Sequence, residues 1–454
     1  MNPTPVSSWG TEPRSSGWGL ALIGAGLVAF YIMLPLDRGF PRIPVLGRPL
    51  NPAVVASVGA LVVTIFHSRG GALSLFRHRY CVILSLYVVV LIGASLRAAA
   101  PLAALQLTAA FYSTFVVNYV VLRYIADRAG ASRLVALVAW VGVAAAGVGV
   151  LQGLFGIRFA IYETWYTRYF QAQAPDQAAG GARGFGTLSH PILYGTAMAL
   201  LVPYVLSIRS VVLRGVLLSV ILVAAALTGS RTVLLAMLVF VVGAIVVYRW
   251  RTLWVVPWVF VVAAFGVQVL GGWGAAVSDP RVRYLAGRVG IGDDASSQYA
   301  AGNIALRKEA LVHGFREVST QWGPVTWLVG KGQFASAELG QEVSATFNTV
   351  DNAFFGILYE KGLVGLAFFL WAFLAHLRVT RGTARSTLHW YAPVALLATG
   401  FSFSFDAYST FNILAVCSMA IASVLATGSR LRGVQAVSGA RTITSMADKL
   451  PPRP

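Results

Sequence analysis

Residues 298–318 read QYAAGNIALRKEALVHGFREV, and this stretch sets the interpretation of the rest of the chain. Its apolar residues recur with the period of an α-helix and share one face, at Ile304, Leu311, Phe315 and Val318. Its polar residues lie on the opposite face, at Glu309, His313 and Arg316. Arg307 falls at the border between the faces, where it can point into a cavity or into solvent. The pattern predicts an amphipathic helix.

This helix belongs to a polar interval that runs from Gly271 to about Val350 and ends at the pair Asp351-Asn352. A connection of about eighty residues is usually either functional or disordered. Aromatic residues argue against disorder here, and they occur at Trp273, Tyr284, Tyr299, Phe315, Trp322, Trp327 and Phe334. We therefore expect a structured loop that carries the chemistry of the protein.

The composition places this loop in a membrane protein. The chain has 454 residues, of which 57% are hydrophobic and 11% are charged, whereas soluble domains have about 25% charged residues. The 35 Lys and Arg residues outnumber the 16 Asp and Glu residues. Positive charge in short loops sets membrane topology, so this excess does not indicate a nucleic-acid partner. Cys81 and Cys417 lie in separate apolar segments and imply neither a disulfide framework nor a metal site.

Twelve segments are apolar over about the 20 residues that a membrane helix needs. They cover residues 18–36, 50–66, 80–96, 101–125, 133–152, 188–207, 211–228, 231–248, 252–271, 351–377, 389–407 and 409–428. We therefore expect an all-α polytopic membrane protein with about 12 transmembrane helices. A large helical extracytoplasmic loop is expected between helices 9 and 10.

The predicted organisation starts and ends with polar tails. Its segments are the tail 1–17, helices 1–9 at 18–271 with an outer loop at about 153–187, the large loop at 272–350, helices 10–12 at 351–428, and the basic tail 429–454. We expect the last tail to be disordered. The first apolar run is too long for a cleaved signal peptide, so it is interpreted as a retained helix.

Arginine counts in the short segments predict the orientation. With the N-terminus in the cytoplasm, fourteen arginines fall in inner short segments and five in outer ones. The positive-inside rule therefore places both termini in the cytoplasm and both long loops outside. Arg231 is then an outer arginine in a tight turn between two apolar runs. It either snorkels to the outer headgroups or marks a ligand path.

The first outer loop leads into a membrane helix through Arg183-Gly-Phe-Gly-Thr-Leu-Ser-His190-Pro-Ile-Leu-Tyr-Gly195. Pro191 suits the first helical position, and either Ser189 or His190 can cap the helix. A helix start also presents N–H groups to a phosphate. His190 is thus either a cap or packing residue or a catalytic candidate.

The second outer loop closes with Gly330-Lys-Gly332, then Asp351-Asn352, and then a helix that carries Glu360-Lys361-Gly362. Two interpretations of Asp351 stay open. It stabilises the helix N-terminus, or it acts as a general base within reach of an acceptor hydroxyl. The pair Asp293-Asp294 has no further ligands at a suitable spacing, so no metal site is predicted.

Taken together and in order, these motifs resemble those of the bacterial O-antigen ligase and O-antigen polymerase superfamily. The resemblance spans about residues 183–366. It rests on Arg183-Gly-Phe-Gly with Pro191, Thr228-Gly-Ser-Arg231, Arg307 in a loop helix, Gly330-Lys-Gly332, Asp351-Asn352, and Glu360-Lys-Gly362-Leu-Val-Gly365.

The resemblance implies a metal-independent, inverting glycosyltransferase of the membrane-embedded GT-C type, in a bacterial cytoplasmic membrane and without a cofactor. Such enzymes take a glycan from a polyprenyl-diphosphate-linked donor on the outer face and join it to an acceptor glycan or glycolipid. By analogy, Arg231 and Arg307 engage the donor diphosphate, with Arg183 as a third arginine, and Asp351 is the base. The further candidates are His190, His313, Lys331, Asn352 and Glu360.

One position departs from the ligase pattern, because ligases of this family commonly have His-Asn where this chain has Asp351-Asn352. Aspartate still accepts a proton, so transfer chemistry is expected, but the change favours a surface polysaccharide polymerase over a ligase. A transporter or flippase for lipid-linked glycans is the competing class. Such transporters often have internal repeats and charged or broken mid-membrane helices, and neither pattern occurs in this sequence.

Overall fold

The computed structural model describes residues 17–33, 44–45, 48–49, 52–157, 159, 186–188, 191–208, 210–228, 233, 237, 295–343, 352–380 and 412–427. Over these residues the protein is helical, apart from one antiparallel pairing of β1 (Pro44–Val45) with β2 (Arg48–Pro49). Helices occupy nine of the twelve predicted apolar intervals. The other three, 231–248, 252–271 and 389–407, lie outside the described residues except for Val233 and Met237.

Among the described residues, four helices are long and apolar enough to cross a membrane. They are Arg79–Leu96, Pro101–Ala129, Ala131–Phe155 and Ala353–Arg378. Five shorter apolar helices accompany them, at Gly17–Met33, Val54–His67, Leu193–Leu206, Val211–Ala226 and Asn412–Thr427. This confirms the prediction of a helical protein with apolar helices of membrane type, whereas the number of spans stays a prediction.

The N-terminal half forms a bundle around one central helix. Its elements are α1 (Gly17–Met33), α2 (Pro52–His67), η2 (Gly71–Arg77), α3 (Arg79–Leu96), α4 (Pro101–Tyr112), the π-helical turn η3 (Ser113–Val117), α5 (Asn118–Ala129) and α6 (Ala131–Phe155). In the most apolar part of the continuous run α4, η3 and α5, 72% of the residues are buried. The share is 44% in the corresponding parts of α3 and α6. It therefore lies at the centre of this half.

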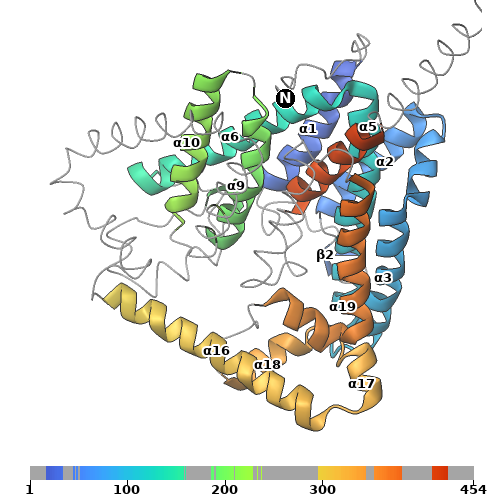
Figure 1. Cartoon of the computed structure of the whole chain (residues 1–454), viewed down its shortest axis with the longest axis vertical. Helices are drawn as coiled ribbons and strands as arrows, with labels where there is room; N and C mark the ends of the chain where they lie inside the picture. Colours follow the sequence, from blue (N-terminus) through green and yellow to red (C-terminus); the bar gives the residue numbers. More distant parts are fainter. Residues whose placement is uncertain are drawn as a thin grey trace, which may run out of the picture.

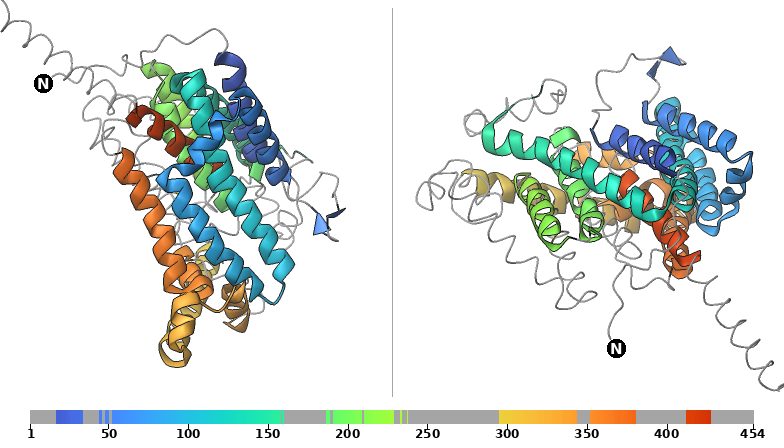
Figure 2. Two further views of the ribbon diagram at one scale, coloured as in Figure 1. Left: turned by 90° about the vertical axis from the view of Figure 1, so that its right-hand side faces the viewer. Right: turned by 90° about the horizontal axis from the view of Figure 1, so that it is seen from above.

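Further helices complete the body, with η5 (Gly186–Leu188), α9 (Pro191–Leu206) and α10 (Val211–Ala226) beside α6. The long helix α19 (Ala353–Thr380) runs beside α3 in two views (Figures 1 and 2). Tyr87 of α3 contacts both α19 and α4. Its ring centroid lies 5.8 Å from that of Phe369 on α19 and 5.3 Å from that of Phe111 on α4.

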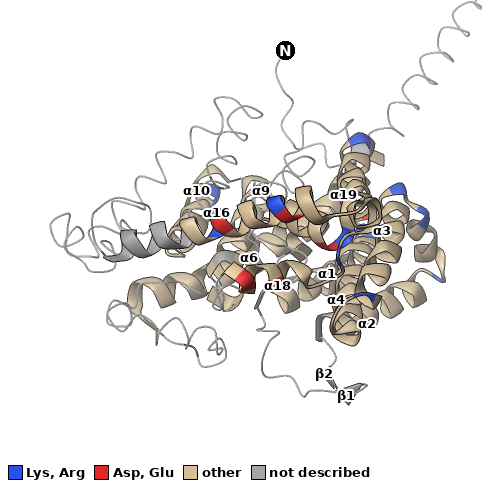
Figure 3. Ribbon diagram, turned by 90° about the horizontal axis from the view of Figure 1, so that it is seen from below, with Lys and Arg blue, Asp and Glu red and all other residues tan. Residues whose placement is uncertain are grey.

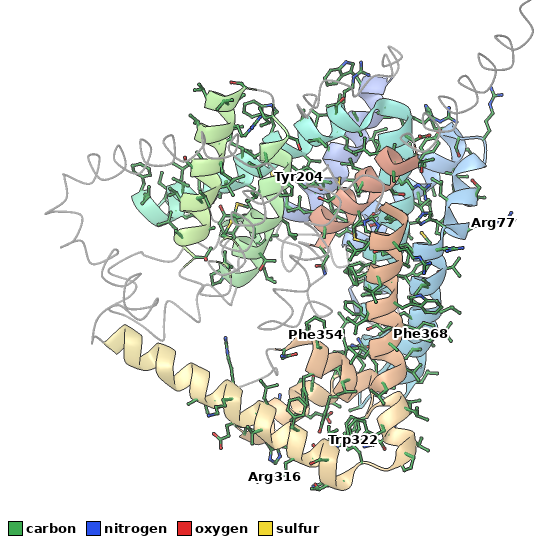
Figure 4. The ribbon with its side chains drawn as sticks, in the orientation of Figure 1. Arg77, Tyr204, Arg316, Trp322, Phe354 and Phe368 are labelled. Atoms are coloured by element: carbon green, nitrogen blue, oxygen red, sulfur yellow. The ribbon has the colours of Figure 1, made fainter. Side chains whose placement is uncertain are left out.

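The polar loop folds at one end of this bundle. It comprises α16 (Ala295–Gln321), α17 (Pro324–Val329) and α18 (Ala335–Val343), drawn in gold in Figure 1. These helices and the start of α19 share a small apolar core of their own, which contains Ala310, Val318, Leu339, Phe355 and Tyr359. Trp322 extends this core, and its ring centroid lies 5.4 Å from that of Tyr359 with the two rings tilted by 45° (Figure 4). Residues 295–343 are thus helical and structured as expected, whereas their place in an extracytoplasmic loop stays a prediction.

The predicted apolar face of this helix needs one correction. Val318 is buried as expected, but Phe315 is 56% exposed and Glu317 is buried in its place. The reason is Gly314, where an added Cβ would lie 2.5 Å from the Phe355 ring and 2.7 Å from Leu339. The absent side chain lets α16 approach α19 closely, which turns the buried face toward Gly314 and leaves Phe315 at its edge.

Candidate functional site

The described residues include five of the nine predicted site residues, namely Arg307, His313, Lys331, Asn352 and Glu360. Arg183, His190, Arg231 and Asp351 lie outside them, so their predicted roles stay predictions. Of the five, the structure brings Lys331 and Glu360 together, and it places the other three on α16 and at the start of α19.

Two glycine motifs that are far apart in the sequence are joined by their backbones. The amide of Lys331 donates to the Tyr359 carbonyl at 2.9 Å, and the amide of Gly332 donates to the Glu360 carbonyl at 3.0 Å. These carbonyls are available because α19 is interrupted at Gly362, where φ is 67° and ψ is −171°. Such a conformation is essentially restricted to glycine.

The close approach also requires glycine at both motifs. A Cβ on Gly330 would lie 2.3 Å from the Glu360 carbonyl carbon, and one on Gly362 would lie 2.3 Å from the Leu328 carbonyl oxygen. Backbone atoms cannot move aside as a flexible side chain can. The loop and α19 are therefore in direct main-chain contact through Gly330-Lys-Gly332 and Glu360-Lys-Gly362.

A carboxylate completes this contact from α16. Glu317 accepts a hydrogen bond from the Lys331 ammonium at one oxygen and from the Tyr359 hydroxyl at the other. Burial alone would raise the pKa of Glu317, but the hydrogen bonds from Lys331 and Tyr359 outweigh it, so the pKa lies below its ordinary value. Glu317 is therefore an ionised, buried anchor at which α16, the glycine loop and α19 meet. Figure 3 shows acidic positions of α16 in red, with the molecule seen from below relative to Figure 1.

A second polar contact lies beside the first. The Glu360 carboxylate accepts from the Ser336 hydroxyl at 2.5 Å and pairs with the Lys361 ammonium at 3.0 Å. Lys361 is fully buried and Glu360 is 7% exposed. Breaking a buried ion pair on one side leaves an uncompensated charge, which is strongly destabilising. Glu360 thus serves to tie α18 to α19 in this structure.

Gln333 links the same loop to the membrane bundle. Its backbone amide donates to the Ala94 carbonyl at 3.1 Å, and its side-chain oxygen accepts from the Ser95 hydroxyl at 2.8 Å. The Thr108 hydroxyl lies 3.4 Å from the same oxygen. The loop is therefore fixed to the C-terminal end of α3 and to α4 as well as to α19.

The start of α19 shows how Asn352 is used. The Asn352 side-chain oxygen accepts from the Phe355 amide at 2.9 Å, and its carbonyl accepts from the Gly356 amide at 2.8 Å. This is the hydrogen bonding of an N-cap residue. Asn352 therefore fills the capping position, and the neighbouring carboxylate of Asp351 is not needed for it.

Arg307 and His313 both lie on α16 but differ in their surroundings. His313 makes an exposed pair with Glu342 at 3.4 Å, with 47% and 64% of the two side chains accessible. Surface pairs of this kind contribute little to stability. Arg307 is partly buried and lies seven residues before Gly314, which places it on the same face two turns along the helix.

The first glycine motif is fixed in a separate part of the molecule. The Thr187 hydroxyl donates to the Ile32 carbonyl of α1, and the Gln152 side chain of α6 donates to the Gly186 carbonyl at 3.4 Å. Gly186 has a φ of 54°, and a Cβ there would lie 2.0 Å from the Tyr194 ring. The short turn Gly186–Leu188 is thus held by α1, α6 and α9, three residues after Arg183.

The second motif meets the first at Gly195. A Cβ on Gly195 would lie 2.5 Å from Val233 and 3.1 Å from the Thr228 hydroxyl, so the end of α10 approaches the first turns of α9. Thr228 in turn donates to the Ala225 carbonyl at 2.6 Å. Within the described residues, Gly195, at the end of the first sequence run, therefore lies beside Thr228, the first residue of the second motif.

Sequence reasoning missed Glu317, Gln333 and Tyr359. Glu317 was hidden because it occupies a position next to the predicted apolar face, and Gln333 follows the Gly330-Lys-Gly332 motif without a signal of its own. Among the described residues, no group of three His, Cys, Asp or Glu side chains is arranged to hold a metal ion. No protein-family model matches this chain, and no curated protein matches it.

Proposed function

We propose that this protein is a membrane glycosyltransferase. It moves a glycan from a polyprenyl-diphosphate-linked donor to an acceptor sugar hydroxyl on the outer face of a bacterial cytoplasmic membrane, as a surface polysaccharide polymerase does. The proposal includes about twelve spans, cytoplasmic termini and a reaction site beneath the loop 272–350. It rests on the motifs that resemble the O-antigen ligase and polymerase superfamily.

The observation that supports it best is that these motifs meet in pairs. Gly330-Lys-Gly332 contacts Glu360-Lys-Gly362 through main-chain hydrogen bonds, although about thirty residues separate them. The Gly186 turn contacts Tyr194 of α9, and the next residue of α9, Gly195, lies beside Thr228. The first of these pairings does not follow from adjacency in the chain, because α18 lies between its two segments.

In the proposed reaction, the acceptor hydroxyl oxygen attacks the anomeric carbon of the donor. The bond from that carbon to the diphosphate oxygen breaks, and the lipid diphosphate leaves with the electron pair. Asp351 takes the hydroxyl proton as general base. Arg231 and Arg307, with Arg183, bind the departing diphosphate through paired N–H donors, which are strongest in a water-poor site. Guanidinium groups supply this charge, so the proposed mechanism uses no metal ion.

A deletion strain tests the function in cells. Loss of a polymerase leaves surface glycans of single repeat units, which gel electrophoresis of the glycans and mass spectrometry of the lipid-linked intermediates resolve. Long lipid-linked chains that are no longer transferred would instead identify a ligase. Lipid-linked units trapped on the cytoplasmic side would identify a flippase and contradict the proposal. Restoration by the plasmid-borne wild-type chain controls for indirect effects.

A further inference from the structure

The described contacts of α16 with the rest of the loop and with α19 concentrate in its C-terminal half. Ala310, Gly314 and Val318 face the apolar core that α18 and α19 share with it. Gly314 brings the helix against Phe355, four residues after the proposed base position Asp351. The orientation of α16 is thus set over about two turns of helix near Gly314.

Arg307 lies outside this packed region. It precedes Gly314 by seven residues, which is about 10.5 Å along the axis, and it faces the same side. Since a helix is stiff over two turns, a small change of tilt or rotation at Gly314 displaces the guanidinium group of Arg307. A change that moves the packed half therefore also moves Arg307.

Packing at Gly314 sets how closely α16 approaches α19, and a buried hydrogen-bonded charge adds a directional constraint on its rotation. Both oxygens of Glu317 are occupied, one by Lys331 and the other by Tyr359. Lys331 is itself held by its backbone to the Tyr359 carbonyl at 2.9 Å, so the three residues form a closed unit of fixed geometry.

We propose that Glu317 is a positioning residue that holds α16, and with it Arg307, in one orientation against α19 through Lys331 and Tyr359. The consequence for catalysis rests on the proposed function, because it is the diphosphate role of Arg307 that makes its position matter. The fixed orientation of α16 does not depend on that role. The two parts can therefore be tested separately.

A double-mutant cycle with Arg307 tests the catalytic part. Glu317→Gln keeps the shape but places an amide N–H₂ against the Lys331 ammonium or the Tyr359 hydroxyl. A misplacement of about 1 Å can cost about a hundredfold in rate, so we expect kcat to fall by roughly ten- to a hundredfold. KM for the lipid-linked donor should change less than kcat. In an Arg307→Lys background the same change should have almost no further effect, because the group that Glu317 positions has already lost its function.

Two controls accompany the cycle. Glu309→Gln removes a carboxylate from the exposed side of the same helix and should leave kcat unchanged. Lys331→Arg keeps the positive charge beside Glu317 and should retain more activity than Lys331→Met. If Glu317→Gln lowers kcat by the same factor with and without Arg307, Glu317 acts independently of it and the positioning role is overturned.

A spectroscopic measurement tests the orientation of α16 without any transfer assay. Spin labels are placed at Lys308 of α16 and Leu102 of α4, two exposed positions, in a chain with Cys81→Ala and Cys417→Ala. Pulsed electron–electron distance measurement in lipid nanodiscs should give one narrow distribution for the parent and for Glu309→Gln. Glu317→Gln should broaden it.

The outcomes separate the two proposals. Unchanged distance distributions in Glu317→Gln would overturn the positioning inference even if the enzyme is active. Broadened distributions in a chain that transfers no glycan would uphold the role of Glu317 in fixing α16, while the proposed function would fall.

Discussion

Asp351 and Asn352 are adjacent, and the hydrogen bonds at the start of α19 assign the cap to Asn352. Asn352 caps the helix through the Phe355 amide, so the hydrogen-bonded cap is one residue after Asp351. The sequence alone left both roles open for Asp351, because a carboxylate near a helix start serves either purpose. The sequence did not decide whether position 351 or position 352 is the N-cap, and an uncertainty of one residue is usual at helix ends.

With Asn352 as the cap and Asp351 as the proposed base, substitutions at the two positions should affect different properties. Asn352→Ala should lower the free energy of unfolding by about 1 kcal/mol through loss of the cap, with modest effect on turnover. Asp351→Asn keeps the size of the side chain but removes the proton acceptor, and general base catalysis typically contributes at least about a hundredfold. Thermal unfolding in detergent and turnover measurements on both variants check this. Near-normal turnover by Asp351→Asn would exclude it as the base and make His190 and His313 the next residues to test.

At the scale of elements, the apolar helices were predictable because hydrophobic length alone identifies them. The contact between the loop and α19 was not. It depends on Gly314, Gly330 and Gly362, whose importance lies in how closely two backbones approach, and no periodicity in the sequence reports that distance. For the same reason the buried face of α16 was misjudged by one position at Phe315.

Gly362 should be the least replaceable of these glycines. Gly362→Ala introduces a side chain at φ 67° and ψ −171° against the Leu328 carbonyl, so we expect a loss of at least about 2 kcal/mol in stability. Gly356→Ala is the matched control, because it lies in the same helix with nothing within 4 Å of the added Cβ. The control should be neutral or stabilising by up to about 1 kcal/mol. Equal thermal stability of both variants would contradict the described backbone contact.

The attachment of α16 should also respond to acid. The pKa of Glu317 is lowered in the folded protein, so its contribution is fully present above the ordinary carboxyl pKa and is lost as the pH falls through the lowered value. The groups that face it are Lys331 and Tyr359, with His313 nearby on the same helix. Distances between labels at Lys308 and Leu102 should therefore stay constant from pH 8 to about pH 5 and broaden only in stronger acid. Broadening near pH 6.5 would point to a histidine instead.

At the scale of the whole molecule, the helical loop 295–343 lies at one end of the bundle, on the side where α3 ends and α19 begins (Figures 1 and 2). The arginine distribution predicts that this end is the outer one. A cysteine at Ser319, exposed on α16, should react with a membrane-impermeant thiol reagent in intact cells. A cysteine at Ser438 in the C-terminal tail should react only after lysis. The reverse pattern would invert the topology and move the proposed site to the cytoplasm.

The central claim is transfer of a glycan from a lipid diphosphate, and reconstitution tests it most directly. Purified protein in lipid vesicles is given a polyprenyl-diphosphate-linked repeat unit and an acceptor glycan, and mass spectrometry follows glycan length and released polyprenyl diphosphate. We predict one released diphosphate for each unit added, unchanged turnover with a chelator, and loss of most activity in Arg231→Lys and Arg307→Lys, since lysine lacks the paired donors. Absence of both products from the wild-type chain, or wild-type turnover by both lysine variants, would contradict the account.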